Sequence, residues 1–260
     1  MRAIGTFAGT VLRRFFWLQF SVKLRLRRIP IVNVDHPLDE TIPFEPARIS
    51  EYADFISFWI RPLGLIGERF GRAAQRRHTN EYLGLITRCY REAAEVYSET
   101  MTTTRRPKYR RGGFLVIHLF DPHLLCVPSL HVMVVVLTQA FFRRVWAELG
   151  ADASEVDALP RELFDGAVAI TESVMYIKQH SVNCIPAALY AMHRIIPGDV
   201  SDDDAATFVD ALFAGGSEVE AENVEAIRAH IRSVFAELMA DGAEDAEWMP
   251  AVQRFVAQFR

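Results

Sequence analysis

Apolar residues recur at helical spacing along most of the chain, whereas the alternating pattern of a half-buried strand is nearly absent. The pattern predicts helices over residues 49–77 with a break at Pro62, from Asn80 to about Val96, and over 128–149, 161–176 and 185–196, followed by three helices within 201–260. We therefore predict an all-α helical bundle in which the helices that begin at Pro128 and Arg161 are adjacent at the centre.

Breaks in this pattern divide the chain into three parts. Residues 1–46 form a basic N-terminal helix and a proline-rich, extended connector (29–46), residues 47–200 a helical core, and residues 201–260 an acidic helical segment. A polar loop is expected over 150–160, ending at Pro160. In the last segment, Ser201 is expected to cap a helix, and Gly215-Gly216 and Asp241-Gly242 to separate the helices.

Charge is distributed unevenly along the chain. The first 30 residues contain seven basic residues and no acidic one, whereas residues 201–260 contain thirteen acidic and four basic residues. The net charge of -4 argues against general nucleic-acid binding. In the first part, the cations alternate with Phe15, Phe16 and Trp17, which is typical of a helix that lies on an anionic membrane. A helix packed on the protein with its arginines in water is the alternative.

The sequence also bears on the location of the protein. No run reaches the 18 or more uncharged apolar residues expected of a spanning helix, and the N-terminal apolar run is cut by Arg13-Arg14. Three scattered cysteines are too few for a disulfide framework or a zinc site. We expect a cytoplasmic or peripheral membrane protein, with an integral membrane protein as the alternative.

Two histidine-containing segments are candidates for the functional site. The first is Pro128-Ser129-Leu130-His131, and the second runs from Ser173 through Lys178 to His180. Histidine titrates near neutral pH, so that one can attack while the other donates a proton. The N-terminus of a helix, where Ser129 is expected, favours an anion. This chemistry suits a phosphate-like centre, and two ordinary helix-end histidines are the alternative.

A basic segment precedes these histidines. Five cations occur within the seven residues 105–111, which include Pro107 and are followed by Gly112-Gly113. Arginine and lysine in an electropositive loop are typical phosphate ligands. A merely solvated basic run is the alternative.

The spacing of these pieces resembles the type 2 phosphatidic acid phosphatase superfamily, which includes lipid phosphatases and inositol phosphorylceramide synthases. Its pattern is K-x6-R-P, then P-S-G-H, then S-R-x5-H-x3-D. Arg106-Pro107 matches the end of the first element, Pro128 to His131 the second with Leu130 in place of glycine, and Ser173 with His180 the third. The resemblance covers about residues 99–192.

The resemblance implies a helical core and a phosphohistidine mechanism. His180 would be the nucleophile, His131 the general acid, and Arg106 and Ser129 ligands of the phosphate, with Ser173 and Lys178 as further candidates for binding it. No metal and no other cofactor is implied. The expected partner is a phosphorylated small molecule or lipid.

Three positions depart from the family pattern. Glu99 occupies the position of the lysine, Val174 that of the arginine after Ser173, and Cys184 that of the aspartate that orients the nucleophile. A catalytically impaired relative that binds an anionic headgroup or a protein partner is therefore the second hypothesis. A third is a metal site, built from residues that lie close together in the sequence: His118, Asp121, His123, Cys126 and His131.

Overall fold

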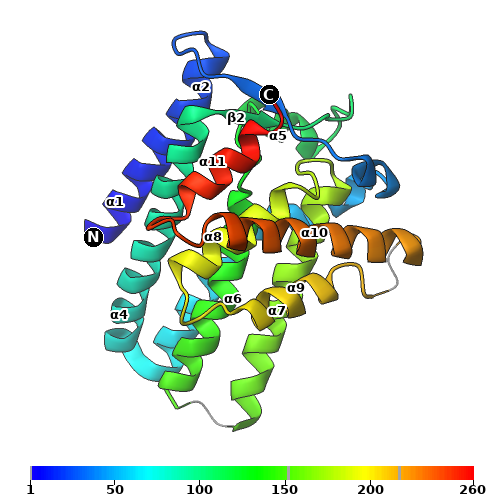
Figure 1. The fold of residues 1–260 in the computed structure, drawn as a ribbon. Helices are drawn as coiled ribbons and strands as arrows, with labels where there is room; N and C mark the ends of the chain where they lie inside the picture. Colours follow the sequence, from blue (N-terminus) through cyan, green and yellow to red (C-terminus); the bar gives the residue numbers. More distant parts are fainter. Residues whose placement is uncertain (1, 151–152, 216–217) are drawn as a thin grey trace.

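The computed structural model describes residues 2–150, 153–215 and 218–260. Helices account for 71% of it and strands for 3%, which confirms the all-α class (Figure 1). In chain order the elements are α1 (Arg2–Thr10), the π-helix η1 (Val11–Phe16), α2 (Trp17–Lys23), β1 (Ile31–Asn33), the 3₁₀ helices η2 (Pro37–Thr41) and η3 (Pro46–Arg48), α3 (Ile49–Ala53), α4 (Phe55–Glu99), β2 (Met101–Thr103), α5 (Gly113–Phe120), α6 (Leu130–Glu148), α7 (Ala153–Tyr176), α8 (Cys184–Ile195), α9 (Asp202–Ala211), α10 (Ala221–Asp241) and α11 (Met249–Ala257).

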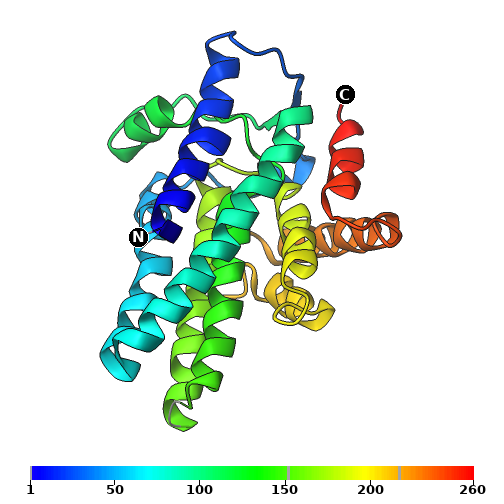
Figure 2. The same ribbon diagram turned by 90° about the vertical axis from the view of Figure 1, so that its left-hand side faces the viewer.

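Helix α6 forms the centre of the bundle. Every residue from 132 to 142 is buried, because this stretch is almost wholly apolar and a helix that is apolar all round needs neighbours on every side. Helices α4, α7 and α8 supply them, and α6 and α7 run side by side (Figure 2). The predicted adjacency of the helices at the centre is therefore confirmed.

The predicted break at Pro62 is wrong. Helix α4 continues through Pro62, which is buried, so tertiary packing offsets the loss of one backbone hydrogen bond. The non-helical residue is Gly71 instead, with φ of +84°, a conformation that glycine adopts without steric cost. Asn80 lies within the same helix and does not cap a new one.

The predicted loop over 150–160 is also largely wrong. Helix α7 begins at Ala153, eight residues before the predicted start at Arg161, and contains Pro160. Leu159 and Leu163, four residues apart on either side of Pro160, are both buried, so the apolar face already extends across the proline. Residues 151–152 of this segment lie outside the described residues.

The connector is extended only in part: it forms the short strand β1, but the 3₁₀ helix η2 occupies Pro37–Thr41, where an extended chain was predicted. Strand β1 pairs in parallel with β2, with Ile31 opposite Met101, Val32 opposite Thr102 and Asn33 opposite Thr103. This two-stranded sheet places the connector beside the basic loop that follows β2.

The three helices of the C-terminal segment occur as predicted. Ser201 caps α9 through a reciprocal capping box with Asp204. Helix α10 packs on α8, and α11 packs on α4. Gly216 of the predicted separator lies outside the described residues. Residues from all three predicted segments contribute to one hydrophobic core.

Among the described residues, one helix is long and apolar enough to cross a membrane by length and composition. It is α6, and 78% of that stretch is buried in the bundle, as in a core helix.

Trp248 attaches the C-terminal segment to the bundle and provides a test of the fold. Its ring is 1% exposed, and its Nε1–H donates to Glu92 Oε2 at 2.8 Å. We expect Trp248→Ala to lower the free energy of unfolding by about 3–5 kcal/mol, through a cavity and a lost hydrogen bond.

Chemical denaturation measures this change. Trp17→Ala is the matched control, because Trp17 is 52% exposed and its loss should cost no more than about 0.5 kcal/mol. Similar losses in the two variants would contradict the role assigned to Trp248.

Candidate functional site

The site lies where α6 begins. Ser129 caps this helix, with its Oγ accepting the Val132 N–H at 3.3 Å. His131 follows in the first turn, and His180 lies in the connection between α7 and α8. His180 Nε2 is 3.4 Å from His131 Nδ1, and the two rings are inclined by 67°. The structure thus brings together two histidines that are 49 residues apart in the sequence.

A tight turn after α7 directs His180 toward α6. The N–H groups of Gln179 and His180 both donate to the carbonyl of Val174, at 2.8 and 3.1 Å. Lys178 adopts a φ of +57°, the left-handed conformation common after a helix C-terminus. This reversal keeps His180 beside the end of α7, so that its ring reaches Ser129.

The connector holds this turn from the other side. Asp39 Oδ1 accepts the Val182 N–H at 2.8 Å, and Asn183 donates to the carbonyl of Val34 at 3.0 Å. The connector therefore contributes to positioning His180.

Ser129 Oγ lies beside the His180 ring. It accepts the Val132 N–H and is 3.2 Å from His180 Nε2, which is also 3.4 Å from His131 Nδ1. In the tautomer whose proton is on Nδ1, Nε2 keeps a lone pair and accepts from the Ser129 hydroxyl. Nδ1 is buried and has no hydrogen-bond partner among the described residues.

Both histidines are neutral in this environment. Burial lowers the pKa of His131 to about 4, opposed by the carboxylate of Asp121. Burial also holds the pKa of His180 well below its usual value, reinforced by His131 and opposed by the Cys126 backbone. Placing a positive charge on either ring therefore requires a new negative charge nearby.

Arg106 reaches the site through two intermediate residues. It donates to Asp121 Oδ2 at 2.6 Å and to the Asp121 carbonyl at 3.1 Å, and it also donates to the side chain of Gln179. Asp121 and Gln179 line the histidine cavity, whereas Arg106 does not. Its Nε–H is buried and has no partner among the described residues, so one donor of the guanidinium is unused.

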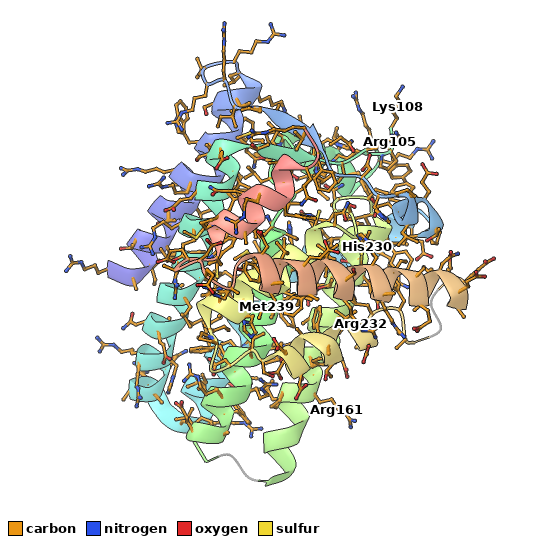
Figure 3. The ribbon with its side chains drawn as sticks, viewed as in Figure 1. Arg105, Lys108, Arg161, His230, Arg232 and Met239 are labelled. Atoms are coloured by element: carbon orange, nitrogen blue, oxygen red, sulfur yellow. The ribbon has the colours of Figure 1, made fainter. Side chains whose placement is uncertain are left out.

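The remaining cations of the basic segment lie farther out. Arg105 and Lys108 project outward from the loop (Figure 3). The backbone N–H of Arg105 donates to Asp35 at 2.9 Å, and its side chain is 81% exposed. The segment is therefore largely solvated, with Arg106 as its inward-facing member.

Two other predicted phosphate ligands are engaged elsewhere. Lys178 donates to the carbonyls of Asp39, at 2.6 Å, and Ile42, so that its ammonium holds the connector. Ser173 is fully buried and donates to the carbonyl of Ile170 at 2.8 Å. Neither residue lines the histidine cavity.

The departures from the family pattern also have definite environments. Glu99 is 3.9 Å from Arg260 at the end of the chain, and its side chain is 51% exposed. Val174 is buried in the core. The Cys184 thiol accepts the Ser181 N–H at 3.3 Å, and burial raises its pKa well above the usual range, so that it stays uncharged. None of the three supplies the charge that the family pattern has at its position.

Four of the five residues of the metal hypothesis, namely Asp121, His123, Cys126 and His131, line the histidine cavity, but their polar atoms are engaged in other contacts or too far apart for a metal site. His118 hydrogen-bonds with the carbonyl of Tyr109 at 3.0 Å, and His123 with Thr104 Oγ1 at 2.7 Å. Within the described part of the chain, no group of three or more potential ligands is arranged to hold a metal ion.

Two cavities meet at His131. The space beside both histidines has a volume of about 20 Å³, room for about one water molecule. On its other side, His131 lines a pocket of about 340 Å³ between η1, α3, the start of α4 and α5. That pocket is mostly apolar, with Tyr52 and Phe55 packed against the His131 ring at 4.9 and 4.8 Å between centroids.

Sequence reasoning missed the part that Asp121 plays as the partner of Arg106. Its position just after the apolar run of α5 was visible, but the sequence did not reveal the contact with Arg106, fifteen residues earlier. Tyr52 and Phe55 were likewise indistinguishable from ordinary core aromatics.

Comparison of the chain with protein-family models, curated proteins and solved structures returns no significant match in any of the three. The resemblance to the phosphatase superfamily therefore rests on the sequence motifs.

The low pKa of His131 predicts acid sensitivity. In the unfolded chain this histidine has a pKa of 6.5, and in the folded protein about 4. The unfolded state therefore binds the proton first, and the free energy of unfolding falls as the pH drops below 6.5. Between about pH 7 and about pH 5, we expect wild type to lose about 1–2 kcal/mol more than His131→Asn.

Urea unfolding at the two pH values measures the difference. Equal losses in both proteins would show that His131 is not held neutral by the fold.

Proposed function

We propose that the protein transfers or hydrolyses a phosphoryl group on a lipid-like substrate, with His180 as nucleophile and His131 as general acid. The observation that carries this proposal is the facing histidine pair at the N-terminus of α6, in which His180 Nε2 is 3.2 Å from the Ser129 hydroxyl and 3.4 Å from His131 Nδ1. The positive end of the helix and the Ser129 hydroxyl favour the phosphoryl oxygens there.

The proposed reaction has two steps. The Nε2 lone pair of His180 forms a bond to phosphorus as the bond from phosphorus to the leaving oxygen breaks, and His131 donates a proton to that oxygen. A water or alcohol then attacks the phosphohistidine, giving its proton to His131. His131 must carry a proton before the first step. A substrate monoanion can bring this proton, because the negative charge of the bound substrate raises the low pKa of His131.

Substrate binding requires a local rearrangement. A cavity of about 20 Å³ cannot hold a phosphoryl group between His180 Nε2 and His131 Nδ1, which are 3.4 Å apart. Because His131 lines both cavities, rotation of its ring toward the apolar pocket would join them. The same movement would allow Asp121 and the unused Nε–H of Arg106 to contact the substrate.

The apolar pocket supports a lipid-like substrate. It ends at His131 and Asp121, and aromatic and aliphatic side chains from η1, α4 and α5 line it. An acyl chain in this pocket would place its phosphorylated end near the histidines.

A non-catalytic role in binding an anionic headgroup is the second candidate. The buried Nδ1 of His180 favours it, because in the described part of the chain no carboxylate accepts a hydrogen bond from this atom to orient the imidazolium that forms during attack. Turnover of site variants distinguishes the two roles.

We expect His180→Ala to lower phosphate release from p-nitrophenyl phosphate and from dispersed phosphatidic acid by at least about 10³-fold, since the nucleophile is lost. His131→Ala should impair phosphatidic acid more than p-nitrophenyl phosphate, because a nitrophenolate leaves without protonation. Cys184→Asp should raise turnover by about tenfold, by supplying an orienting carboxylate.

Two controls accompany these variants. Cys184→Asn has the size of aspartate without its charge, and His193→Ala removes a histidine that pairs with Asp202 on the surface at 3.2 Å. If folded wild type, His180→Ala and Cys184→Asp are equally inactive, catalysis is refuted and the binding role stands.

A further inference from the structure

Helix α5 exposes an unusual amount of apolar surface. Leu115, Val116, Leu119 and Phe120 are 48%, 56%, 60% and 63% exposed, and Phe114 is the one buried residue of this helix. Exposed apolar groups gathered on so short an element mark an interaction surface rather than ordinary surface variation.

The helix is nonetheless held in place. Phe114 packs edge-on against Phe44 and Tyr109, and His118 bonds to the Tyr109 carbonyl at 3.0 Å. The anchored side thus faces the protein, and the apolar sides point outward.

Two neighbouring elements extend this apolar surface. Ile56, 59% exposed, lines the same pocket as Val116 and Phe120, and Ile60 follows one turn later on α4 at 47% exposure. The helix formed by α1, η1 and α2 contributes Leu12 and Trp17, which are 62% and 52% exposed. These three elements lie on one side of the molecule (Figure 2).

The N-terminal helix is only partly covered by the protein. Phe7 and Phe15 contact Tyr90 of α4, and Leu18 and Val22 are buried. The packing of one side on the protein agrees with the second alternative raised by the sequence, and the outer side is exposed.

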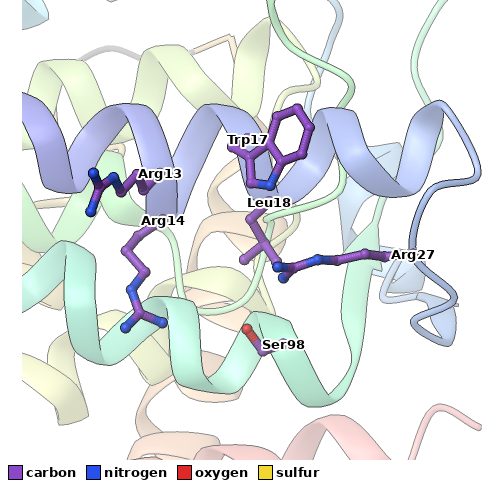
Figure 4. Close-up of a pocket in the computed structure, with 6 residues that line it drawn as sticks. All are labelled: Arg13, Arg14, Trp17, Leu18, Arg27 and Ser98. Atoms are coloured by element: carbon purple, nitrogen blue, oxygen red, sulfur yellow. The ribbon is translucent and has the colours of Figure 1, made fainter.

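Cations border the apolar surface. Lys23, Lys108 and Arg110 line a pocket of about 490 Å³ together with Leu115 and Leu119. On the other flank of the N-terminal helix, Arg13, Arg14 and Arg27 line a groove of about 550 Å³ beside Ser98 of α4 (Figure 4).

We propose that this side of the protein binds an anionic lipid bilayer, with α5 inserted at the interface. The lipid-facing surface comprises Leu12, Trp17, Ile56, Ile60, Leu115, Val116, Leu119 and Phe120 with the bordering cations. Apolar side chains bordered by lysine and arginine complement acyl chains beneath anionic headgroups. The role of the 340 Å³ pocket as an entrance for a lipid chain rests on the proposed function, whereas bilayer binding does not.

The test is co-sedimentation with vesicles. Wild type should bind vesicles of phosphatidylcholine and phosphatidylglycerol more tightly than pure phosphatidylcholine vesicles. Leu115→Asp with Leu119→Asp should weaken binding to the mixed vesicles by more than about tenfold, since two apolar side chains no longer enter the interface. Ile31→Asp is the matched control, because Ile31 is 48% exposed on β1 and lines neither the 340 Å³ pocket nor the 490 Å³ pocket.

A second pair of substitutions tests the charges. Lys108→Glu with Arg110→Glu should reduce binding to the mixed vesicles and leave binding to phosphatidylcholine unchanged. Wild type that fails to sediment with the mixed vesicles, or α5 variants that bind like wild type, would overturn the proposal. A dimer in sedimentation velocity that Leu115→Asp with Leu119→Asp dissociates, without vesicle binding, would identify the surface as a protein interface instead.

Turnover of soluble p-nitrophenyl phosphate by the same α5 variants separates this proposal from the proposed function. Lost vesicle binding with wild-type turnover supports the lipid-facing surface and leaves catalysis intact. If wild type binds vesicles but has no turnover, the lipid-facing surface is supported and only the proposed catalytic function is contradicted.

Discussion

The burial of α6 is the constraint on which the rest of the structure depends. A helix that is apolar on every side is stable in water only when other helices surround it, and α4, α7 and α8 do so. Surrounding α6 with α7 and α8 leaves the connection between those two helices beside its first turn. The meeting of His180 with Ser129 and His131 is therefore a consequence of core packing.

The site combines features of a reactive centre with features of a closed one. The facing histidines and the helix N-terminus suit attack on phosphorus. The site is neutral, because both histidines have low pKa values and Arg106 pairs with Asp121. Its cavity also leaves no room for an anion. An anionic substrate would supply the missing charge, and His131, at the wall between the two cavities, is the residue whose movement would admit it.

Local rules of helix formation failed where packing outweighed them. Pro62 and Pro160 read as helix breaks, yet both lie inside helices whose apolar faces continue past them. At Gly71 the chain does leave the helical conformation, because glycine permits the positive φ at no steric cost. At the site, the roles of Lys178 and Ser173 depended on acceptors that the sequence could not locate: the Asp39 carbonyl, 139 residues away, and the Ile170 carbonyl within the same helix.

The sequence by itself determined the helical class and the central pair of helices, because periodicity is a local property of the chain. It placed the start of α6 at Pro128, two residues too early, and it singled out the two histidines through the motifs that contain them. Tertiary structure alone decided that Arg106 contacts Asp121 and Gln179, that the connector holds the His180 turn, and that α5 faces outward. The first two contacts depend on which distant segments of the chain meet in the folded protein. The exposure of α5 depends on whether a neighbouring element covers its apolar side chains. The spacing of residues along the sequence specifies neither the contacts between distant segments nor the covering of a helix face.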